Sequence, residues 1–375
     1  MPDIKEIKNY REEIDSVDES LIKLFEERMN LSKAIGKYKR TNNIAIQDSE
    51  REQEIVDKAV SLTDSELKGE VTLLMRSIMA LSREYQRSLL FENISELLPA
   101  PTEAKTEGVK AVFQGAPGAW GEQAARKVFP DAELISADFF EDVFNMVKNG
   151  EADYGVVPLE NSKTGAIGET YDLLRTYGCY IVGRTWIDIK HCLLAKPSAE
   201  QRDIREVFSH PEGFKQCHRY LADKSWDFIA CSNTAVAAEK VAASDGNKAA
   251  AIGSRGAAKH NGLEVLAEDI MDYGNNRTSF VIISANPEYT EKSDLISITF
   301  STAHRSGALC EALTPFMVAD VNLTRIESRP TSLQKNYRFF AEISGNILDE
   351  EIKDTLKHAA GVTEYFEVIG CYSEV

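Results

Sequence analysis

The strongest constraint on the fold is a helical repeat of apolar residues near the N-terminus. Large aliphatic side chains recur at intervals of seven or fourteen residues, at Ile7, Ile14, Leu21 and Ile35. Neither Gly nor Pro interrupts residues 4–35. Residues seven apart share one face of an α-helix, so this spacing predicts a single long amphipathic helix that ends at Asn42 and Asn43.

Two shorter helices are predicted to follow. The pair Ser49 and Glu52 matches a capping box, and so does the pair Thr63 and Glu66. Apolar residues at helical spacing between positions 71 and 85 continue the third helix. Residues 1–98 are therefore expected to form an all-α domain of three helices.

Arg28 stands on the apolar face of the first helix, where the repeat predicts an aliphatic side chain. An arginine on a packed face is costly unless an anion pairs with it. Either Arg28 binds an anionic ligand, or its side chain extends to water or to a neighbouring glutamate. Lys39 lies about 16 Å from Arg28 along the helix axis, near enough to share a small ligand, whereas Arg11 lies about 26 Å away. Arg11 therefore serves another purpose or reaches a site on a second subunit.

Eight polar residues of these helices together resemble the pattern of the all-helical chorismate mutases. They are Arg11, Arg28, Lys39, Asp48, Arg51, Glu52, Ser82 and Gln86. Members of that family are intertwined dimers, so the resemblance implies that Arg11 is donated across a dimer. It also implies that Arg51 supports the site from the start of the second helix.

The chemistry of chorismate agrees with these residue types. Its rearrangement needs a held conformation and donors at the breaking ether bond, but no nucleophile and no metal. The resemblance implies that Arg11 and Arg28 hold the two carboxylates. It further implies that Lys39 and Gln86 hydrogen-bond the ether oxygen and that Glu52 binds the ring hydroxyl.

Chain length and composition divide the remaining residues. A chain of 375 residues, 43% of them apolar, exceeds one hydrophobic core and fits two or three domains. Residues 99–107 are rich in Pro, Ala and charge, which predicts a linker. Predicted strands at 109–114, 154–157, 179–184, 191–195, 249–252 and 279–284 alternate with predicted helices at 122–129, 138–149, 168–177, 212–223 and 233–243. This alternation predicts an α/β domain over residues 108–285, with two lobes and a cleft between them.

The stretch from Gly155 to Gly168 is the most prominent polar loop of this domain. Its apolar strand is expected to end at Pro158, which cannot donate to a sheet, and polar residues follow up to Thr164. Such loops contact ligands in α/β proteins, although an ordinary connecting loop has the same composition. Further polar loops lie at 209–217 and 275–280. Three such loops in one domain indicate a site in the cleft.

These loops, with the sequences FQGAPGAWGEQAA at 113–125 and HCLLAK at 191–196, resemble those of the prephenate dehydratases. The family's Thr-Arg-Phe signature reads Thr-Ser-Phe here at 278–280, while Gly121 and Glu212 replace the usual Ser and Gln. Arg277 is then the candidate to replace the missing arginine. The resemblance implies a dehydratase site made of Glu160, Asn161, Ser162, Ser209, Gln216, Thr278 and Phe280.

Prephenate becomes aromatic by losing carbon dioxide and its ring hydroxyl, so the site needs a donor to the departing hydroxyl. By the resemblance, Thr278 donates this hydrogen bond, while Asn161, Ser209 and Gln216 orient the substrate. A threonine hydroxyl is too weak an acid to act alone, which makes Glu160 the candidate proton source.

Residues 294–375 are predicted to form a third domain. Strands at 295–300, 321–328, 337–344 and 364–371 and helices at 306–318 and 348–359 give the order βαββαβ of α+β ferredoxin-like folds. Two clusters resemble the ACT domains that sense amino acids, and with Asn322 they imply an allosteric phenylalanine site: Gly307, Ala308 and Leu309, then Glu327, Ser328, Arg329 and Pro330. A helix start with a glycine suits an amino-acid carboxylate. The alternative is a structural cap beside a surface ion pair.

Composition excludes several classes of function. Sixty acidic against 43 basic residues give a net charge of −17, which argues against nucleic acid and anionic membranes as partners. The glycines at 115, 118 and 121 do not have the dinucleotide-binding spacing, so no cofactor is expected. Six cysteines without C-x-x-C or zinc-ligand spacing indicate reduced thiols in the cytoplasm and no metal. The charged N-terminus and the lack of long apolar segments predict neither a signal peptide nor a membrane span.

The combined expectation is a cytoplasmic bifunctional enzyme of phenylalanine biosynthesis, present as a homodimer or higher homo-oligomer. It converts chorismate to prephenate and prephenate to phenylpyruvate, and phenylalanine inhibits it. Two alternatives remain open at this point. The dehydratase could prefer arogenate, the amino analogue of prephenate, or the chain could be an aromatic amino-acid sensor whose catalytic sites are degenerate.

Overall fold

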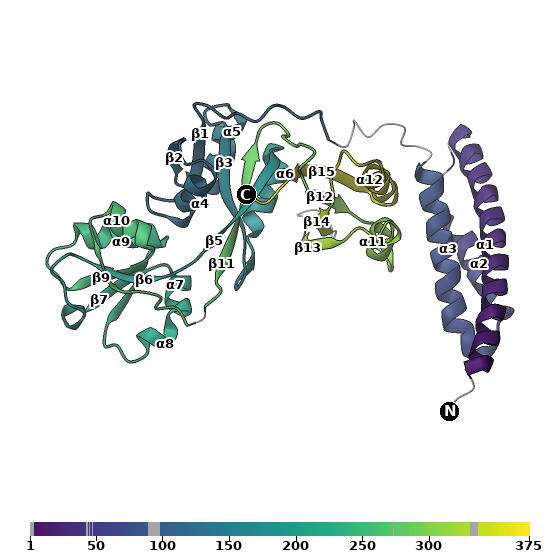
Figure 1. The fold of residues 1–375 in the computed structure, drawn as a ribbon, viewed down its shortest axis with the longest axis horizontal. Helices are drawn as coiled ribbons and strands as arrows, with labels where there is room; N and C mark the ends of the chain where they lie inside the picture. The colour runs from purple at the N-terminus through teal and green to yellow at the C-terminus, as the bar shows by residue number, and fades with distance from the viewer. Residues whose placement is uncertain are drawn as a thin grey trace.

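The computed structural model describes residues 4–42, 44, 46, 48–88, 98–272, 274–330 and 337–375. A helical domain lies at one end of the molecule and a two-lobed α/β region at the other, with the C-terminal residues between them (Figure 1). Among the described helices, none has the length and apolar character needed to cross a membrane.

The helical domain contains α1 (Ile4–Thr41), α2 (Ser49–Ser61), the short 3-10 helix η1 (Ser65–Leu67) and α3 (Lys68–Ser88). The predicted long helix is confirmed, with Asn42 just after its end and Asn43 outside the described residues. Both predicted capping boxes are wrong. Asp48, not Ser49, caps α2, because its carboxylate accepts from the Arg51 amide at 3.1 Å. The Thr63 hydroxyl instead donates to the preceding helix, to the Ala59 carbonyl at 2.7 Å.

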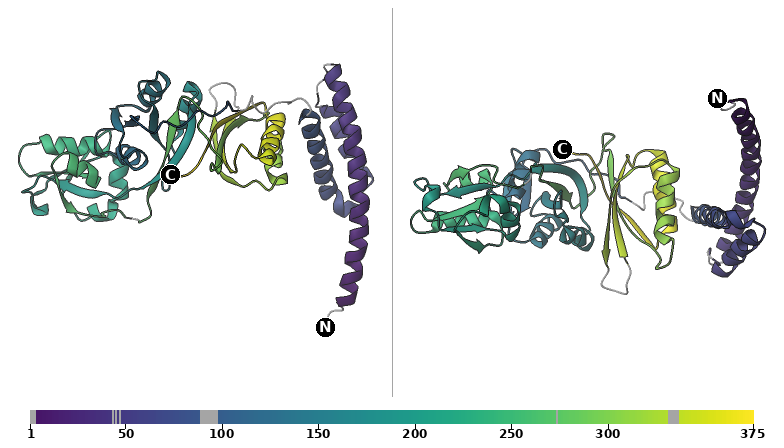
Figure 2. Two further views of the ribbon diagram at one scale, coloured as in Figure 1. Left: turned by 45° about the horizontal axis from the view of Figure 1, so that its top comes forward. Right: turned by 90° about the horizontal axis from the view of Figure 1, so that it is seen from below.

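The apolar face of α1 is largely uncovered within the chain. Ile14 and Leu31 expose 56% and 63% of their surface, and Ile7, Val17, Leu21, Leu24 and Ile35 are also exposed. The N-terminal half of α1 extends beyond α2 and α3 (Figure 2). Where α1 does meet α3, a Cβ on Gly36 would lie 2.8 Å from the Gln86 side chain, so this glycine allows the close approach that sets the position of Gln86.

The α/β region has two sheets, as predicted for two lobes. The first lobe contains β1 (Lys110–Gln114), β2 (Glu133–Ala137), β3 (Tyr154–Asn161), β4 (Gly165–Ala166), β5 (Tyr180–Asp188) and β11 (Arg277–Ser284), with α4 (Trp120–Val128), α5 (Phe140–Lys148) and α6 (Gly168–Tyr177). The second lobe contains β6 (Cys192–Ala195), β7 (Glu206–Ser209), β8 (Asp227–Ala230), β9 (Ala249–Gly253) and β10 (Glu264–Ala267), with α7 (Pro211–Gln216), α8 (His218–Leu221), α9 (Thr234–Ala243), α10 (Arg255–His260) and the 3-10 helix η3 (Gln201–Asp203). The chain passes from the first lobe to the second after β5 and returns to the first lobe before β11. These two connections link the lobes.

The prediction that Pro158 ends its strand is wrong. Strand β3 continues to Asn161, and its pairing with β11 shifts register there: Phe280 faces Pro158, whereas Ser279 faces Glu160. A bulge tolerates proline because the ladder is already interrupted. The continued strand places Asn161 directly opposite Thr278.

The C-terminal region, residues 295–372, has the predicted βαββαβ order. It comprises β12 (Leu295–Ser301), α11 (Ala308–Val318), β13 (Leu323–Pro330), β14 (Tyr337–Ser344), α12 (Glu350–Val362) and β15 (Tyr365–Tyr372). Its strands lie in the order β13-β14-β12-β15, and apolar residues of α11 and α12, such as Phe316 and Leu356, pack with β12. Phe340 and Tyr372 pack into the core of the first lobe, beside Tyr171.

The C-terminal region and the first lobe share one continuous sheet. Strand β15 pairs with β5 at Gly370 and Ile181, where a Cβ on Gly370 would lie 2.2 Å from the Ile181 carbonyl oxygen. Residues 99–107, predicted as a linker, also run along the α/β region: the Thr102 amide donates to Pro287 and the Lys105 amide to Tyr154, both at 2.9 Å. On its other side the C-terminal region meets the helical domain, since α12 lies against α3.

Candidate active sites

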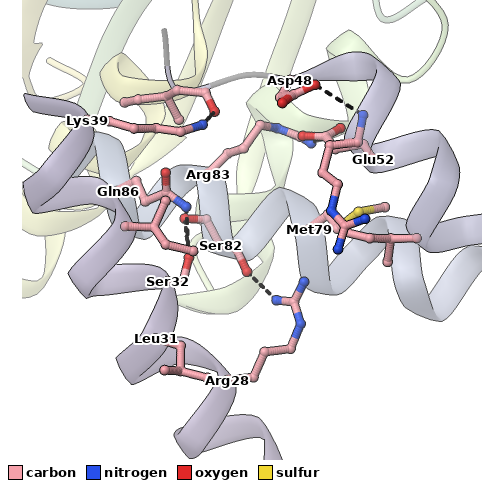
Figure 3. A pocket seen from close by; sticks show the side chains of 14 residues that line it. Arg28, Leu31, Ser32, Lys39, Asp48, Glu52, Met79, Ser82, Arg83 and Gln86 are labelled. Carbon is pink, nitrogen blue, oxygen red and sulfur yellow. Dashed lines mark hydrogen bonds and ion pairs between the residues drawn. The ribbon is translucent and has the colours of Figure 1, made fainter. Parts of the chain in front are cut away.

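The helical domain contains a cavity of about 370 Å³ lined by seven of the eight predicted mutase residues (Figure 3). These are Arg28 and Lys39 from α1, Asp48, Arg51 and Glu52 from the start of α2, and Ser82 and Gln86 from α3. Arg11 is not among the lining residues. The cavity therefore gathers side chains that lie up to 58 positions apart in sequence, as Arg28 and Gln86 do.

Arg28 is the cation whose environment most favours an anionic ligand. Its Nη1 donates to the Ser82 hydroxyl at 2.5 Å, and Ser82 donates in turn to the Ile78 carbonyl at 2.8 Å. Partial burial lowers the pKa of the Arg28 guanidinium. A cation that has lost solvent and donates to a neutral hydroxyl attracts a carboxylate more strongly than one at the surface.

Gln86 and Lys39 provide donors at the other end of the cavity. Lys39 Nζ donates to the Ile46 carbonyl at 2.6 Å, and Gln86 Nε2 donates to the Ser32 hydroxyl at 2.8 Å. The buried Gln86 Oε1 has no hydrogen-bond partner among the described residues. A half-turn of this amide would direct its NH₂ group to that position, where it can donate to an ether oxygen, while Ser32 donates to the amide oxygen.

Asp48 and Arg51 mainly organise the start of α2. Asp48 caps the helix, and Arg51 Nη1 pairs with Glu54 at 2.8 Å on the surface. The cap holds Glu52, one residue after Arg51, at the edge of the cavity.

Arg83 is a cavity residue that the sequence reasoning missed. Its side chain is only 7% exposed, and its Nη1 lies 2.5 Å from Glu52 Oε2. The signal was present, because Arg83 follows the buried Met79 by one helical turn, where an apolar residue is expected. Arg28 was identified in the same way, as an arginine at an apolar position of a helix.

In the α/β region, Asn161 and Thr278 lie at the centre of a buried polar network. Asn161 Nδ2 donates to Thr278 Oγ1 at 2.9 Å and to Asn276 Oδ1 at 2.8 Å. Asn161 Oδ1 accepts from the amides of Lys163 and Thr164 at 2.9 and 3.1 Å, which fixes the orientation of the Asn161 side chain. Because Asn161 is the donor in its bond to Thr278, the hydroxyl proton of Thr278 is directed elsewhere.

The network continues into the second lobe through Gln216. Asn276 Nδ2 donates to Gln216 Oε1 at 3.2 Å, and His191 Nε2 lies 3.0 Å from the same oxygen. An amide oxygen only accepts, so His191 carries its proton on Nε2. Burial lowers the pKa of His191, which favours the neutral ring. Both bonds occupy the oxygen of Gln216 and leave its NH₂ group as the donor.

Asn276 and His191 were quoted within motifs but given no role from the sequence. A lone amide or imidazole at the end of an element carries no distinguishing pattern until its partners are known. Their partners Asn161 and Gln216 lie 115 and 25 positions away in the chain.

The other predicted dehydratase residues have different surroundings. Ser209 donates to the Ile252 carbonyl at 3.2 Å within the second lobe. Ser162 donates to the Asn275 carbonyl at 3.2 Å. Phe280 packs in the core with Phe113 and Val156.

Arg277 and Glu160 both have ion-pair partners within the chain, and their predicted roles stay predictions. Arg277 Nε pairs with Asp188 at 3.0 Å, and its guanidinium lies over the Trp186 ring, so its charge is directed to Asp188 in this arrangement. Glu160 is ion-paired with Arg325 of β13. A carboxylate engaged by an arginine is a poor proton donor.

The two clusters predicted to bind phenylalanine lie at one edge of the C-terminal sheet. Gly307 has φ 81°, a left-handed conformation that favours glycine, and it precedes α11. Arg338 of β14 pairs with Ser301 of β12 on one side and with Arg329 of β13 on the other. The C-terminal ends of β12 and β13 therefore lie at the same end of the sheet, about 10 Å apart. Asn322 precedes the opposite end of β13, and the fold does not bring it to this edge.

Comparison with known proteins identifies both catalytic parts. Residues 10–87 match the family model Chorismate mutase type II, and residues 111–288 match Prephenate dehydratase. The bifunctional chorismate mutase/prephenate dehydratase of Escherichia coli (strain K12) is 31% identical, over 96% of this chain and 95% of that protein. The arogenate dehydratase/prephenate dehydratase 2 of Arabidopsis thaliana is 35% identical, over 76% of this chain and 79% of that protein.

A solved structure agrees with these relatives. The prephenate dehydratase from Arthrobacter aurescens in complex with L-Phe superimposes with a TM-score of 0.65 at 30% identity, covering 71% of this chain and 90% of that one. Family models match the helical domain and the α/β region separately, and a bifunctional relative aligns with nearly the whole chain. The chain therefore belongs to the bifunctional chorismate mutase/prephenate dehydratase family.

Proposed function

We propose that the protein converts chorismate to prephenate in the helical domain and prephenate to phenylpyruvate in the α/β region. The observation that carries this proposal is the cavity in which Arg28, Lys39 and Gln86 meet, within a chain that also holds the Asn161–Thr278 network. The direct test is to incubate the pure protein with chorismate, without any added cofactor, and to follow prephenate and then phenylpyruvate. Failure to form either product would contradict the proposal.

The mutase reaction is a rearrangement within one molecule, so the site acts by holding a compact conformation and stabilising charge. Arg28 binds one substrate carboxylate. Lys39 and the rotated amide of Gln86 donate to the ether oxygen, on which negative charge develops as the C–O bond breaks. Glu52 accepts a hydrogen bond from the ring hydroxyl.

The dehydratase reaction releases carbon dioxide and the ring hydroxyl from prephenate. The C–C bond to the ring carboxylate breaks, its electron pair enters the ring, and the C–O bond on the opposite side breaks as the hydroxyl leaves, becoming water after it gains a proton. Thr278 donates a hydrogen bond to the departing oxygen, because Asn161 leaves the threonine proton available. Gln216 orients the substrate through its NH₂ group, because its amide oxygen already accepts from Asn276 and His191.

We also assign a second copy of this chain to the exposed apolar face of α1. The side chains on this face have the regular spacing of a packing seam but remain exposed in one chain. Arg11 lies on the same helix, outside the cavity of its own chain. A symmetric pairing of two α1 helices would cover the face and bring Arg11 to the partner's cavity as its second carboxylate ligand.

Mixing two inactive variants tests this shared site. Arg11→Ala and Arg28→Ala subunits should each lack mutase activity, and after subunit exchange the mixture should regain roughly a quarter of wild-type turnover, because half of the dimers are mixed and each holds one intact site. The assay follows chorismate consumption, and mass spectrometry of differently tagged subunits verifies the exchange. Exchange without recovered activity would exclude donation of Arg11 across a dimer.

The C-terminal region is proposed to be an ACT domain that binds phenylalanine and inhibits the dehydratase. Support comes from its βαββαβ order and from the strand pairing, which ends β12, the strand before residues 307–309, and β13, which holds residues 327–330, at the same end of the sheet. Polar contacts extend from β13 to the first lobe: Arg325 pairs with Glu160 and donates to the Tyr171 hydroxyl of α6 at 3.1 Å, and Arg329 pairs with Asp172 of α6 at 2.9 Å. Displacement of β13 by a ligand would therefore act on the strand that carries Asn161.

Gly307→Ala tests the location of the phenylalanine site. A Cβ on Gly307 meets no atom within 4 Å, so it would occupy space open to a ligand. Bound phenylalanine should weaken prephenate turnover of the unmodified protein by about 5- to 150-fold, the range of typical allosteric coupling, and Gly307→Ala should raise the phenylalanine concentration needed for half-inhibition. Gly246→Ala is the matched control, because Gly246 also has positive φ and open surroundings. Equal sensitivity of the two variants would place the inhibitory site elsewhere.

Neither alternative function is favoured. The arogenate-named relative covers 76% of the chain, whereas the bifunctional relative covers 96%. A sensor without catalysis would need neither the hydrogen bond from Asn161 to Thr278 nor the arginine and lysine side chains that line the helical cavity. A location in the cytoplasm remains a prediction, supported by six cysteines that are free thiols, five of them buried.

A further inference from the structure

We propose that Arg83 is a positioning residue of the mutase reaction and that Glu311, in the C-terminal region, holds it in place. The inference rests on the proposed mutase function of the cavity. Its origin is a contact that joins two parts of the chain: Arg83 Nη1 lies 2.5 Å from Glu52 Oε2, and Arg83 Nη2 lies 2.7 Å from Glu311 Oε1. One guanidinium on α3 thus connects the start of α2 with the first turns of α11.

The burial of these groups makes the contact more than a surface ion pair. The side chains of Arg83, Glu311 and Glu52 are 7%, 15% and 24% exposed. Ion pairs at the surface contribute little because water screens them, but a desolvated charge depends strongly on each partner. Loss of one partner leaves the others with unbalanced charge, so each group constrains the position of the next.

A fourth group completes the charge balance. Arg305 binds both oxygens of Glu311, with Nη1 at 2.9 Å from Oε1 and Nη2 at 2.5 Å from Oε2. The series Glu52, Arg83, Glu311 and Arg305 alternates in sign and has no net charge. Arg305 and Glu311 thus form a fixed unit of the C-terminal region, and this unit holds one side of the Arg83 fork.

The fork geometry of arginine explains what the anchor does to Glu52. With Nη2 occupied by Glu311, Arg83 offers only Nη1 to Glu52, and the second oxygen of Glu52 remains available to the ring hydroxyl of chorismate. Without Glu311, the guanidinium is free to turn and bind both oxygens of Glu52, which withdraws the carboxylate from the substrate. Arg83 reaches Glu52 from α3 at the wall of the cavity (Figure 3).

Steady-state kinetics on the full-length protein test this inference. Glu311→Gln keeps the shape of the side chain but removes its charge, and we expect the KM for chorismate to rise about 10-fold with a smaller change in kcat, the order expected for one charge-assisted hydrogen bond. Partial unfolding would instead lower kcat at unchanged KM, so the split separates positioning from structural damage. The control is Glu350→Gln, which removes an exposed carboxylate of the same region, paired with Lys353.

A double-mutant cycle identifies Arg83 as the intermediary. Arg83→Met should raise the KM by at least as much, and Glu311→Gln should add nothing in the Arg83→Met background, because Glu311 acts only through Arg83. Additive effects, or a Glu311→Gln variant with the KM of the Glu350→Gln control, would overturn the inference while leaving the proposed function intact. Absence of prephenate formation by the unmodified protein would instead contradict the proposed function, and the inference with it.

Discussion

Replacing Arg28 with alanine should reduce conversion of chorismate to prephenate by about 30- to 5000-fold, because truncating one partner of a desolvated charge pair typically costs about 2–5 kcal/mol. Arg28 is half-buried in the cavity, and its hydrogen-bond partner there, Ser82, is neutral. The positive charge of Arg28 is therefore not balanced by that partner and can bind a substrate carboxylate. Dehydration of added prephenate should remain close to wild type, since Asn161 and Thr278 lie in the other catalytic part.

Two assays on one preparation measure this separation: consumption of chorismate, and formation of phenylpyruvate from added prephenate. Arg76→Ala is the matched control, because Arg76 is an exposed arginine of α3 that does not line the cavity. Parallel loss of both activities in a folded Arg28→Ala protein would contradict two independent sites.

Replacing Thr278 with valine should lower dehydratase turnover by about 100-fold or more, the cost of removing a well-placed donor to developing negative charge. Valine keeps the volume of threonine and removes its hydroxyl, so the KM for prephenate should change much less than kcat. The variant also removes the acceptor of Asn161 Nδ2, but the backbone amides that fix Asn161 Oδ1 remain.

Thr299→Val provides the control for this substitution. Thr299 is fully buried in β12, and its hydroxyl has no hydrogen-bond partner among the described residues, so the same chemical change there should leave turnover unaltered. Turnover of Thr278→Val within a few-fold of Thr299→Val would show that the hydroxyl of Thr278 does not assist departure of the substrate's oxygen.

Some of this architecture follows from local pattern. The repeat of Ile7, Ile14 and Leu21 specifies α1 because residues seven apart share a helix face regardless of what packs on it. The same repeat identified Arg28 as a charged residue at a position where an aliphatic side chain is expected. The order of elements in residues 295–372 was also predictable, because each element there is long enough to show its own period.

Short elements were predicted less well. Strands β7 and β8 have four residues each, too few for an alternating pattern to stand out, and both are held by parallel pairing, β8 with β7 and β7 with β9. Pro158 ends a strand by its own chemistry, yet β3 continues past it because β11 accommodates a bulge. In both cases the partner strand overrides the local preference.

The sequence by itself determined the helices, the classes of element and the residue types that suit chorismate and prephenate. The tertiary structure alone decided which of these residues share a hydrogen bond or a charge. Arg277 pairs with Asp188 instead of entering the dehydratase network, and Arg83 joins Glu52 to Glu311, which lies 228 positions after Arg83. Such contacts depend on the relative placement of elements, which is set by the packing of whole surfaces and leaves no periodic trace in the chain.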